Sequence, residues 1–249
     1  MPEATALRYL WQRDMFEHTY YTRYGDIKSY NEVKTSAILD MLQDVAIKHS
    51  EECSYGLLRL QELNLAWFLQ GIKLHFDKPV RTFEAVTLKT GVKNMKGFLS
   101  ERCTYIHQYG EVIGKAVANW FLFDTDKMKI CRITEDISSH YPIDPFEDSF
   151  FSYSRPGETE ARVCDKIKIS PRDIDTNHHL NNEKAVEILM SALPQDVFFT
   201  DINVSYKRSS FLGEELYICL ARRNKSYYAH LKDGDGNIRV VGVFGRDAL

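Results

Sequence analysis

The chain of 249 residues has no long hydrophobic run. Its longest stretches without a charged residue, such as Leu63 to Ile72 and Ala116 to Phe123, fall far short of the ~20 apolar residues that a membrane-spanning helix needs. The first residues include Glu3 and Arg8 and no apolar segment, so no secretory signal is expected. These absences argue against a membrane or secreted protein and predict that the chain contacts no membrane.

Cysteine and basic charge are also scarce. The five cysteines include no CxxC pair, which predicts neither a disulfide framework nor a structural zinc site and fits a reducing, cytoplasmic environment. A formal net charge of −3 argues against a general nucleic-acid binder. P-loop, GxGxxG and GxSxG patterns are missing, and a calcium loop from Asp173 fails because its sixth residue is His178 and its twelfth Lys184. No metal and no cofactor are predicted.

What the sequence does contain is a repeat. Residues 72–88 align without a gap with residues 202–218, at an offset of 130. Upstream, residues 31–39 match residues 181–189 at an offset of 150, which leaves extra residues in the first copy around Lys48 to Trp67. In each copy a helical apolar period precedes alternating strand patterns and glycine-containing hairpin turns. This order predicts an α+β fold of two units, each an antiparallel sheet wrapped around a central helix.

The predicted division of the chain follows from this repeat. The first unit covers residues 1–125 and the second covers residues 162–249. Residues 126–161 between them contain most of a strongly acidic, proline-bearing stretch and are expected to act as a linker.

Polar residues that suit catalysis lie just before the second helix. Asp175, Asn177 and His179 alternate, so an extended backbone would project all three side chains to one side. A carboxylate, an amide and an imidazole near a helix N-terminus can orient a water, deprotonate it and stabilise an oxyanion. The alternative is simple helix capping by Asn181 or Asn182. The first copy has Gly25, Ile27 and Ser29 at the aligned positions, and this asymmetry favours a functional role.

The run DTNHHLNN, opening the helix of the second of two duplicated units, resembles the acyl-acyl carrier protein (acyl-ACP) thioesterase family of plants and bacteria. The resemblance covers about Phe16 to Phe244. It implies a tandem (double) hot-dog fold with an acyl-chain pocket in the first unit. It also implies hydrolysis of the fatty acyl-ACP thioester, which releases free fatty acid and ends chain elongation in fatty acid biosynthesis. By motif position, Asp175, Asn177 and His179 become the catalytic residues.

One departure from the family pattern concerns its Tyr-x-x-Glu segment, which a cysteine often follows. Here Ser209 stands at the glutamate position and Ser210 at the cysteine position, after Tyr206. A serine cannot act as a carboxylate base near neutral pH, and no thiol is present at position 210. Which residue takes the proton from water therefore stays open.

The implied partner is acyl carrier protein carrying a fatty acyl chain. Basic residues that flank the two motif segments are candidates for docking this acidic partner: Arg172, Lys207 and Arg208. A homodimer stays open. Two alternative functions remain, a non-catalytic acyl-ACP or acyl-chain binding protein, motivated by Ser209, and a hot-dog 3-hydroxyacyl-thioester dehydratase.

Overall fold

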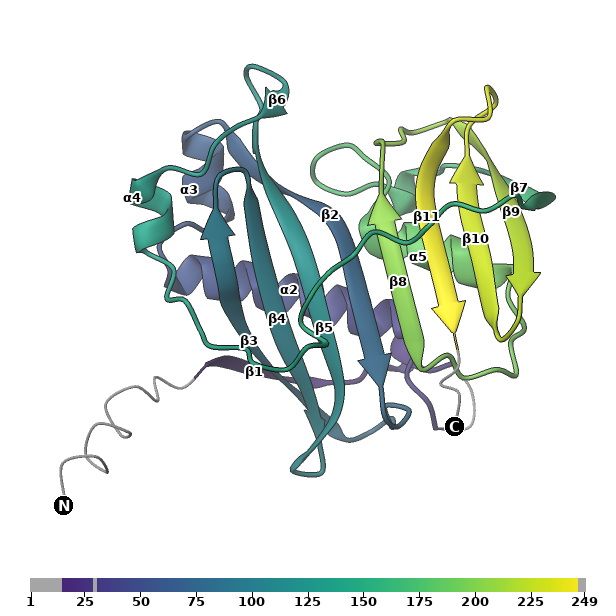
Figure 1. The fold of residues 1–249 in the computed structure, drawn as a ribbon, viewed down its shortest axis with the longest axis horizontal. Coiled ribbons are helices and arrows are strands. Elements are labelled where there is room, and N and C mark those ends of the chain that lie inside the picture. Colours follow the sequence, from purple (N-terminus) through teal and green to yellow (C-terminus); the bar gives the residue numbers. More distant parts are fainter. Residues whose placement is uncertain (1–14, 29–30, 246–249) are drawn as a thin grey trace.

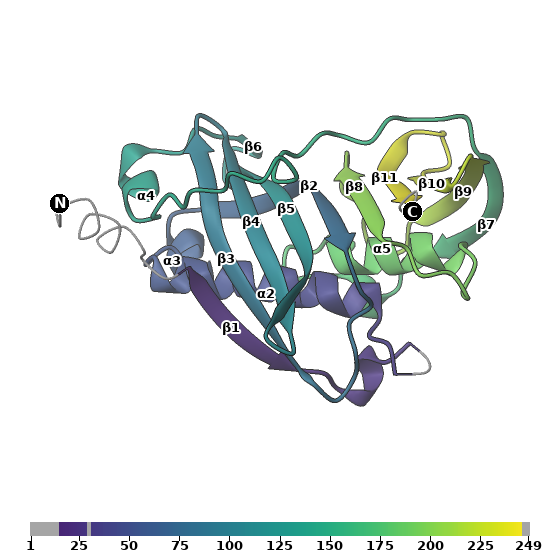
Figure 2. The same cartoon turned by 60° about the horizontal axis from the view of Figure 1, so that its bottom comes forward.

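The computed structural model describes residues 15–28 and 31–245. Its strands form one sheet in the order β1-β3-β4-β5-β2-β8-β11-β10-β9-β7, with the short β6 paired to β5 (Figure 1). Every pair of neighbouring strands is antiparallel. The two long helices, α2 and α5, lie on one face of this sheet (Figure 2). No described helix has the length and apolarity to cross a membrane.

The first unit contains the longer helix. Helix α2 buries Ile38, Leu42 and Val45 against the sheet, as the helical spacing of these residues predicts. Its elements are β1 (Phe16–Tyr21), the 3₁₀ turn η1 (Tyr24–Asp26), α2 (Thr35–Glu52), α3 (Leu57–Glu62), β2 (Leu65–Phe76), β3 (Ala85–Lys96), β4 (Leu99–Gln108) and β5 (Glu111–Asp124). The extra residues expected after the first helix form the end of α2 and the short α3.

The second unit repeats this arrangement with a shorter helix. Its elements are β7 (Arg162–Lys168), the 3₁₀ turn η2 (Pro171–Asp173), α5 (Asn182–Ser191), β8 (Asp201–Tyr206), β9 (Glu215–Arg223), β10 (Ser226–Lys232) and β11 (Ile238–Gly245). The two predicted hairpin turns are present, and Gly110 and Gly236 adopt the positive φ angles, 78° and 82°, that such turns favour. Each unit is therefore an antiparallel sheet wrapped around a helix, which confirms the predicted tandem hot-dog.

Strands β2 and β8 join the two units through a local two-fold relation. They pair antiparallel, with Lys73 opposite Asn203. These two residues are also equivalent in the repeat, at the offset of 130. Equivalent residues face one another only where a two-fold axis passes between them, so the duplicated chain builds internally the contact that two identical subunits would form.

The loops that lead into α2 and α5 correct the alignment of the helices. Turn η1 precedes an isolated bridge between Ile27 and Val33, and turn η2 precedes the same bridge between Ile174 and Leu180. These equivalent bridges set the offset at 147, so the offset of 150 is wrong. A slip of three residues keeps the same helix face inward, and the apolar period of a helix therefore cannot detect it.

The corrected offset changes which first-unit residues correspond to the motif. Asp175, Asn177 and His179 correspond to Lys28, Tyr30 and Glu32, rather than to Gly25, Ile27 and Ser29. Ser29 and Tyr30 lie outside the described residues. The polar trio is still confined to the second copy, because none of the corrected counterparts has the same residue type.

The segment between the units packs on the face of the sheet opposite α2 and α5 (Figures 1 and 2). It contains β6 (Lys129–Ile130) and α4 (Glu135–Ser139). Ile137 of α4 is buried with α3 and the sheet, and Phe151 is buried against Cys103 and Val117 on the outer side of β4 and β5. The acidic segment is therefore part of the folded first unit as well as a connection.

Candidate active site

The motif residues lie in a tight loop between the bridged residues Ile174 and Leu180. Asp175 organises this loop, because its Oδ1 accepts hydrogen bonds from the backbone N–H groups of Asn177 (2.8 Å) and His179 (3.1 Å). The backbone N–H of Asp175 donates to the carbonyl of His179 at 2.8 Å. His178 takes a left-handed conformation with φ of 63°. The prediction of an extended, alternating segment is wrong, because the bridge forces the chain to reverse within five residues.

The His179 ring lies at the seam between the two units. It packs against Phe68 of β2 with ring centroids 5.9 Å apart, and against Phe211 of the second unit at 5.1 Å. In the described part of the chain, no hydrogen bond joins this ring to a carboxylate. The loop therefore brings Asp175, Asn177 and His179 together through backbone contacts, and the imidazole is held by aromatic side chains from both units.

Ser209 and Ser210 lie beside the motif loop. The carbonyl of Ser210 accepts a hydrogen bond from the backbone N–H of Leu180 at 2.8 Å. The Ser210 side chain is only 3% exposed, and its hydroxyl has no partner among the described residues. Ser209 is exposed, and its carbonyl accepts a hydrogen bond from Arg239. The two serines are thus adjacent in space to His179, although neither hydroxyl contacts the imidazole.

The three candidate docking residues differ in their surroundings. Arg172 has an 89% exposed side chain, and Arg208 is exposed as well. Lys207 forms an ion pair with Glu158 of the connecting segment. Arg172 and Lys207 thus each have a carboxylate neighbour, which for Arg172 is Asp173 at 3.9 Å, and all three basic residues are exposed.

A narrow cavity lies inside the first unit, between α2 and strands β2, β4 and β5. Its volume is about 10 Å³, so an acyl chain would occupy it only after its walls move apart. Gln43 of α2 lines the cavity, and its Oε1 accepts a hydrogen bond from the Asn182 side chain at 3.2 Å. The part of the cavity lined by Gln43 is thus close to the start of α5. The wall consists of Leu42, Gln43, Leu69, Ile72, Arg102, Thr104, Ala116, Ala118 and Trp120.

One residue in the cavity wall is an alanine where the second unit has a phenylalanine. Strand pairing places Ala118 opposite Ile72 and Phe244 opposite Ile202. Since Ile72 and Ile202 are equivalent in the repeat, Ala118 and Phe244 are equivalent too. Phe244 is fully buried and fills the space under α5 in the second unit. The smaller Ala118 leaves the corresponding space open, in the unit predicted to hold an acyl-chain pocket.

Two family models match this chain. The acyl-ACP thioesterase N-terminal domain matches residues 13–141, which is more than half of the sequence, and the acyl-ACP thioesterase C-terminal domain matches residues 157–237. The chain belongs to the acyl-ACP thioesterase family. The family resemblance stated from the motif is thereby confirmed.

Curated relatives of the family are distant in sequence. The chloroplastic oleoyl-acyl carrier protein thioesterase 2 of Arabidopsis thaliana is 22% identical over 195 residues, covering 69% of this chain and 53% of the relative. The chloroplastic palmitoyl-acyl carrier protein thioesterase of Gossypium hirsutum is 21% identical over 217 residues, covering 78% and 52%. The chain spans about half the length of these relatives.

Solved structures of the family share the whole fold. An acyl-ACP thioesterase from Bacteroides thetaiotaomicron superimposes with a TM-score of 0.84 at 18% identity, covering 93% of this chain and 97% of that one. The 12:0-ACP thioesterase from Umbellularia californica gives 0.79 at 15% identity, covering 93% and 96%. At this level of identity the likeness establishes the tandem hot-dog fold.

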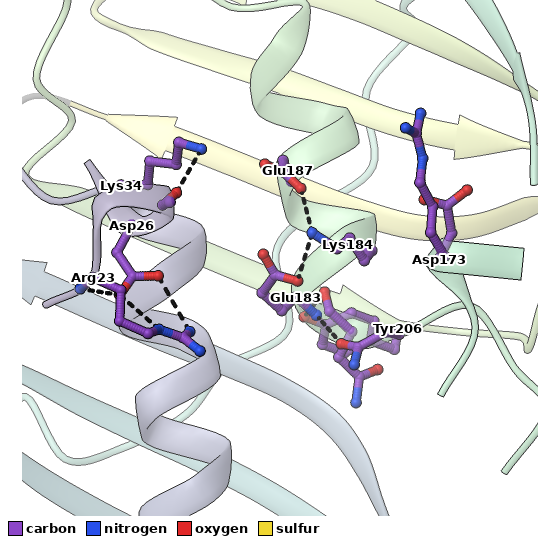
Figure 3. A network of polar contacts seen from close by, with 12 residues as sticks. Arg23, Asp26, Lys34, Asp173, Glu183, Lys184, Glu187 and Tyr206 are labelled. Atoms are coloured by element: carbon purple, nitrogen blue, oxygen red, sulfur yellow. Dashed lines mark hydrogen bonds and ion pairs between the residues drawn. The ribbon is translucent and has the colours of Figure 1, made fainter. Parts of the chain in front are cut away.

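The start of α5 contains a buried carboxyl that the sequence analysis of this acyl-ACP thioesterase family member did not single out. Glu183 is 8% exposed, and burial raises the pKa of its carboxyl. Lys184 lies between Glu183 (3.5 Å) and Glu187 (2.8 Å), as Figure 3 shows. The burial of Glu183 could have been predicted from the sequence, since Glu183 lies three residues before the buried Val186 and therefore on the same helix face.

Asp173, next to the motif, has a structural role. Its Oδ2 accepts a hydrogen bond from the backbone N–H of Ser170 at 2.8 Å. Asp26, its equivalent in the first unit, accepts the same bond from Arg23 at 2.7 Å (Figure 3). A residue with the same contact in both units serves the shared loop rather than a site found in one of them. The described residues contain no group of three His, Cys, Asp or Glu that could hold a metal ion.

Proposed function

We propose that this protein hydrolyses the thioester between a fatty acyl chain and acyl carrier protein and releases free fatty acid. The observation that supports the proposal is the position of the motif loop. It lies at the seam between the units, with His179 three residues before Asn182, whose side chain contacts Gln43 in the cavity wall of the first unit. A thioester placed at His179 would thus have its acyl chain inside the protein and its carrier outside.

We propose the following roles for the loop residues. Oδ1 of Asp175 holds the backbone of the loop, and Oδ2, which has no hydrogen bond within the described residues, accepts a proton from the attacking water. The protonated His179 imidazole gives its proton to the leaving sulfur as the carbon–sulfur bond breaks, and the proton that Asp175 took from water returns to the imidazole through solvent. The exposed Asn177 amide donates to the carbonyl oxygen, and the first turn of α5 favours the negative charge that develops there.

The direct experiment measures thiol release and binding together. Purified protein is mixed with acyl-ACP thioesters of several chain lengths, and free thiol is followed with time. Release of stoichiometric fatty acid and thiol supports a hydrolase. The alternative, a non-catalytic acyl-ACP binding protein, is motivated by Ser209 at the glutamate position. A protein of that kind would show saturable binding without thiol release, and that result would overturn the proposal.

Ser209→Glu is expected to raise the hydrolysis rate. The segment that contains Ser209 runs beside the motif loop. A glutamate side chain there would add a carboxylate near His179 that can accept a hydrogen bond from water. Because Ser209 is exposed, the new charge costs little desolvation. We expect an increase of about tenfold in initial rate. Ser209→Gln, which adds length but no charge, is the matched control, and an equal rate in both variants would contradict a role for the carboxylate.

The proposed docking surface consists of Arg172 and Arg208, with acyl carrier protein as the acidic partner. Reversing both charges to glutamate is expected to raise the KM for acyl-ACP by about tenfold at low salt and much less at high salt. The kinetics of a small acyl-pantetheine thioester serve as the control and are expected to stay unchanged. Equal effects on both substrates would assign the two arginines to chemistry or folding.

The cytoplasm is our proposed location, because all five cysteines are free thiols. The two curated relatives above carry chloroplastic names.

A further inference from the structure

A buried cation forms part of the cavity wall. Arg102 of β4 is 6% exposed and points to the face of the sheet that α2 covers, where it lines the cavity with apolar side chains. Its Nη1 donates to Nδ1 of His49 at 2.7 Å and lies 3.4 Å from the Thr90 hydroxyl. Nε and Nη2 make no hydrogen bond within the described part of the chain. A guanidinium has five N–H donors, so most of them are unused.

No carboxylate neutralises Arg102 by direct contact among the described residues. Asp144 acts on its charge through space without forming a salt bridge to it. The direct partner, His49, is neutral, because burial and the nearby guanidinium lower the pKa of its imidazole to about 3. Isolated buried charges are costly, and proteins normally pair them. The direct hydrogen-bond partners of this charge, His49 and Thr90, are neutral, and the guanidinium lines a cavity.

A second unused donor lines the same cavity. The indole N–H of Trp120 is buried and has no partner among the described residues. Strand pairing places Trp120 of β5 opposite Ser100 and Ala118 opposite Arg102. Arg102 and Trp120 therefore lie on neighbouring strands, two residues apart along the sheet and on the same face. Both would suit a ligand that accepts hydrogen bonds.

The guanidinium lies away from the end of the cavity that adjoins α5. At that end Gln43 contacts Asn182, whereas Arg102 contacts His49, six residues further along α2. Six residues span ~9 Å of an α-helix. An acyl chain that enters beside α5 would therefore meet Arg102 with its distal part rather than with its thioester.

We propose that the preferred acyl chain carries a carboxylate at its distal end and that Arg102 binds this group. The inference rests on the proposed function, because it places the thioester at His179 and the chain in the cavity. A planar guanidinium matches a carboxylate through two parallel hydrogen bonds. The apolar wall accepts the methylene chain, and the Trp120 N–H is a further donor. A terminal methyl group would leave the charge of Arg102, its unused N–H donors and the Trp120 N–H without a partner.

The test compares binding of chains that differ only at the distal end. The probes are acyl-pantetheine amides, in which an amide replaces the thioester, with equal carbon number and either a methyl or a carboxylate terminus. Calorimetry is expected to show that the wild type binds the carboxylate chain at least about tenfold more tightly, as charge-assisted hydrogen bonds imply. Arg102→Met is expected to reverse the preference, and Trp120→Phe to reduce it.

Control variants separate recognition from folding. Arg59→Met removes a 52% exposed arginine and is expected to leave the preference unchanged. Arg102→Lys keeps the charge but loses the forked geometry, so it is expected to show an intermediate preference. It replaces Arg102→Met as the test variant if Arg102→Met does not fold. Tighter binding of the methyl chain by the wild type would overturn the inference. So would an equal loss for both chains in Arg102→Met or, if that variant does not fold, in Arg102→Lys.

A parallel hydrolysis assay with the two acyl-ACP thioesters distinguishes the two proposals. Preferential binding of the carboxylate chain without thiol release would contradict the hydrolase proposal and support the role of Arg102. Rapid hydrolysis of the methyl chain with no preference in binding would support the hydrolase proposal and contradict the role of Arg102.

Discussion

Replacing His179 by alanine is expected to lower turnover of acyl-ACP by at least about a hundredfold, since positioned acid–base groups contribute roughly 10²–10⁴-fold. The fold is expected to persist. The aromatic rings that contact His179 among the described residues are Phe68 and Phe211, and aromatic pairs contribute about 0.5–1.5 kcal/mol each. Initial rates and thermal unfolding of the same preparation check both statements. Full activity in a folded His179→Ala variant would remove this loop from consideration.

The neighbouring histidine provides the matched control. His178 is exposed and has a φ of 63°, a conformation that asparagine tolerates. His178→Asn is therefore expected to keep the loop and the rate of the wild type. A similar loss in both variants would point to a general disturbance of the loop.

The structural and the chemical roles of Asp175 can be separated in the same experiment. Asparagine keeps the Oδ1 acceptor that holds the loop but removes the charge, whereas alanine removes both. We expect Asp175→Asn to lose about a hundredfold or more in turnover with unchanged stability. Asp175→Ala is expected to be less stable as well, by about 1–3 kcal/mol for two lost hydrogen bonds.

Filling the cavity at Ala118 is expected to change chain-length preference strongly. Phe244 already occupies the equivalent place in the second unit, so the fold accepts a phenylalanine there. In Ala118→Phe the ring would exclude the distal methylenes of a long chain. Each buried methylene contributes about 0.8 kcal/mol, so excluding about four lowers kcat/KM by roughly two orders of magnitude. Short chains, which end before Ala118, keep their rates.

A graded series makes this prediction specific. Rates for chains of increasing length are measured for Ala118→Val, Ala118→Leu and Ala118→Phe. The longest accepted chain should shorten with each increase in side-chain volume. Overpacking alone costs about 1–3 kcal/mol of stability and would affect all chain lengths alike. Unchanged hydrolysis of long chains by a folded Ala118→Phe variant would exclude this cavity as the acyl-chain site.

Part of the candidate site was predictable because it depends on residues close together in the chain. The Asp175–His179 motif lies next to a helical period, and both can be recognised within about fifteen residues of sequence. The same holds for the hairpin turns, where glycine permits the positive φ that the turn needs. The serines at positions 209 and 210 were located by their distance from Tyr206.

Other features depended on contacts that no local pattern contains. The bridge between Ile174 and Leu180 turns an alternating sequence into a closed loop. Glu158, 49 residues away in the sequence, pairs with Lys207. The offset of the helices also needed the bridges, because a helical period is nearly unchanged by a slip of three residues.

Residue type and periodicity along the chain were enough to predict a duplicated α+β protein of the acyl-ACP thioesterase family, with its polar motif in the second copy alone. The cavity in the first unit, with Ala118 and the buried Arg102 in its wall, could be found only in the folded protein. These depend on which strands pair and in which register, so the residues involved meet only after the chain has folded.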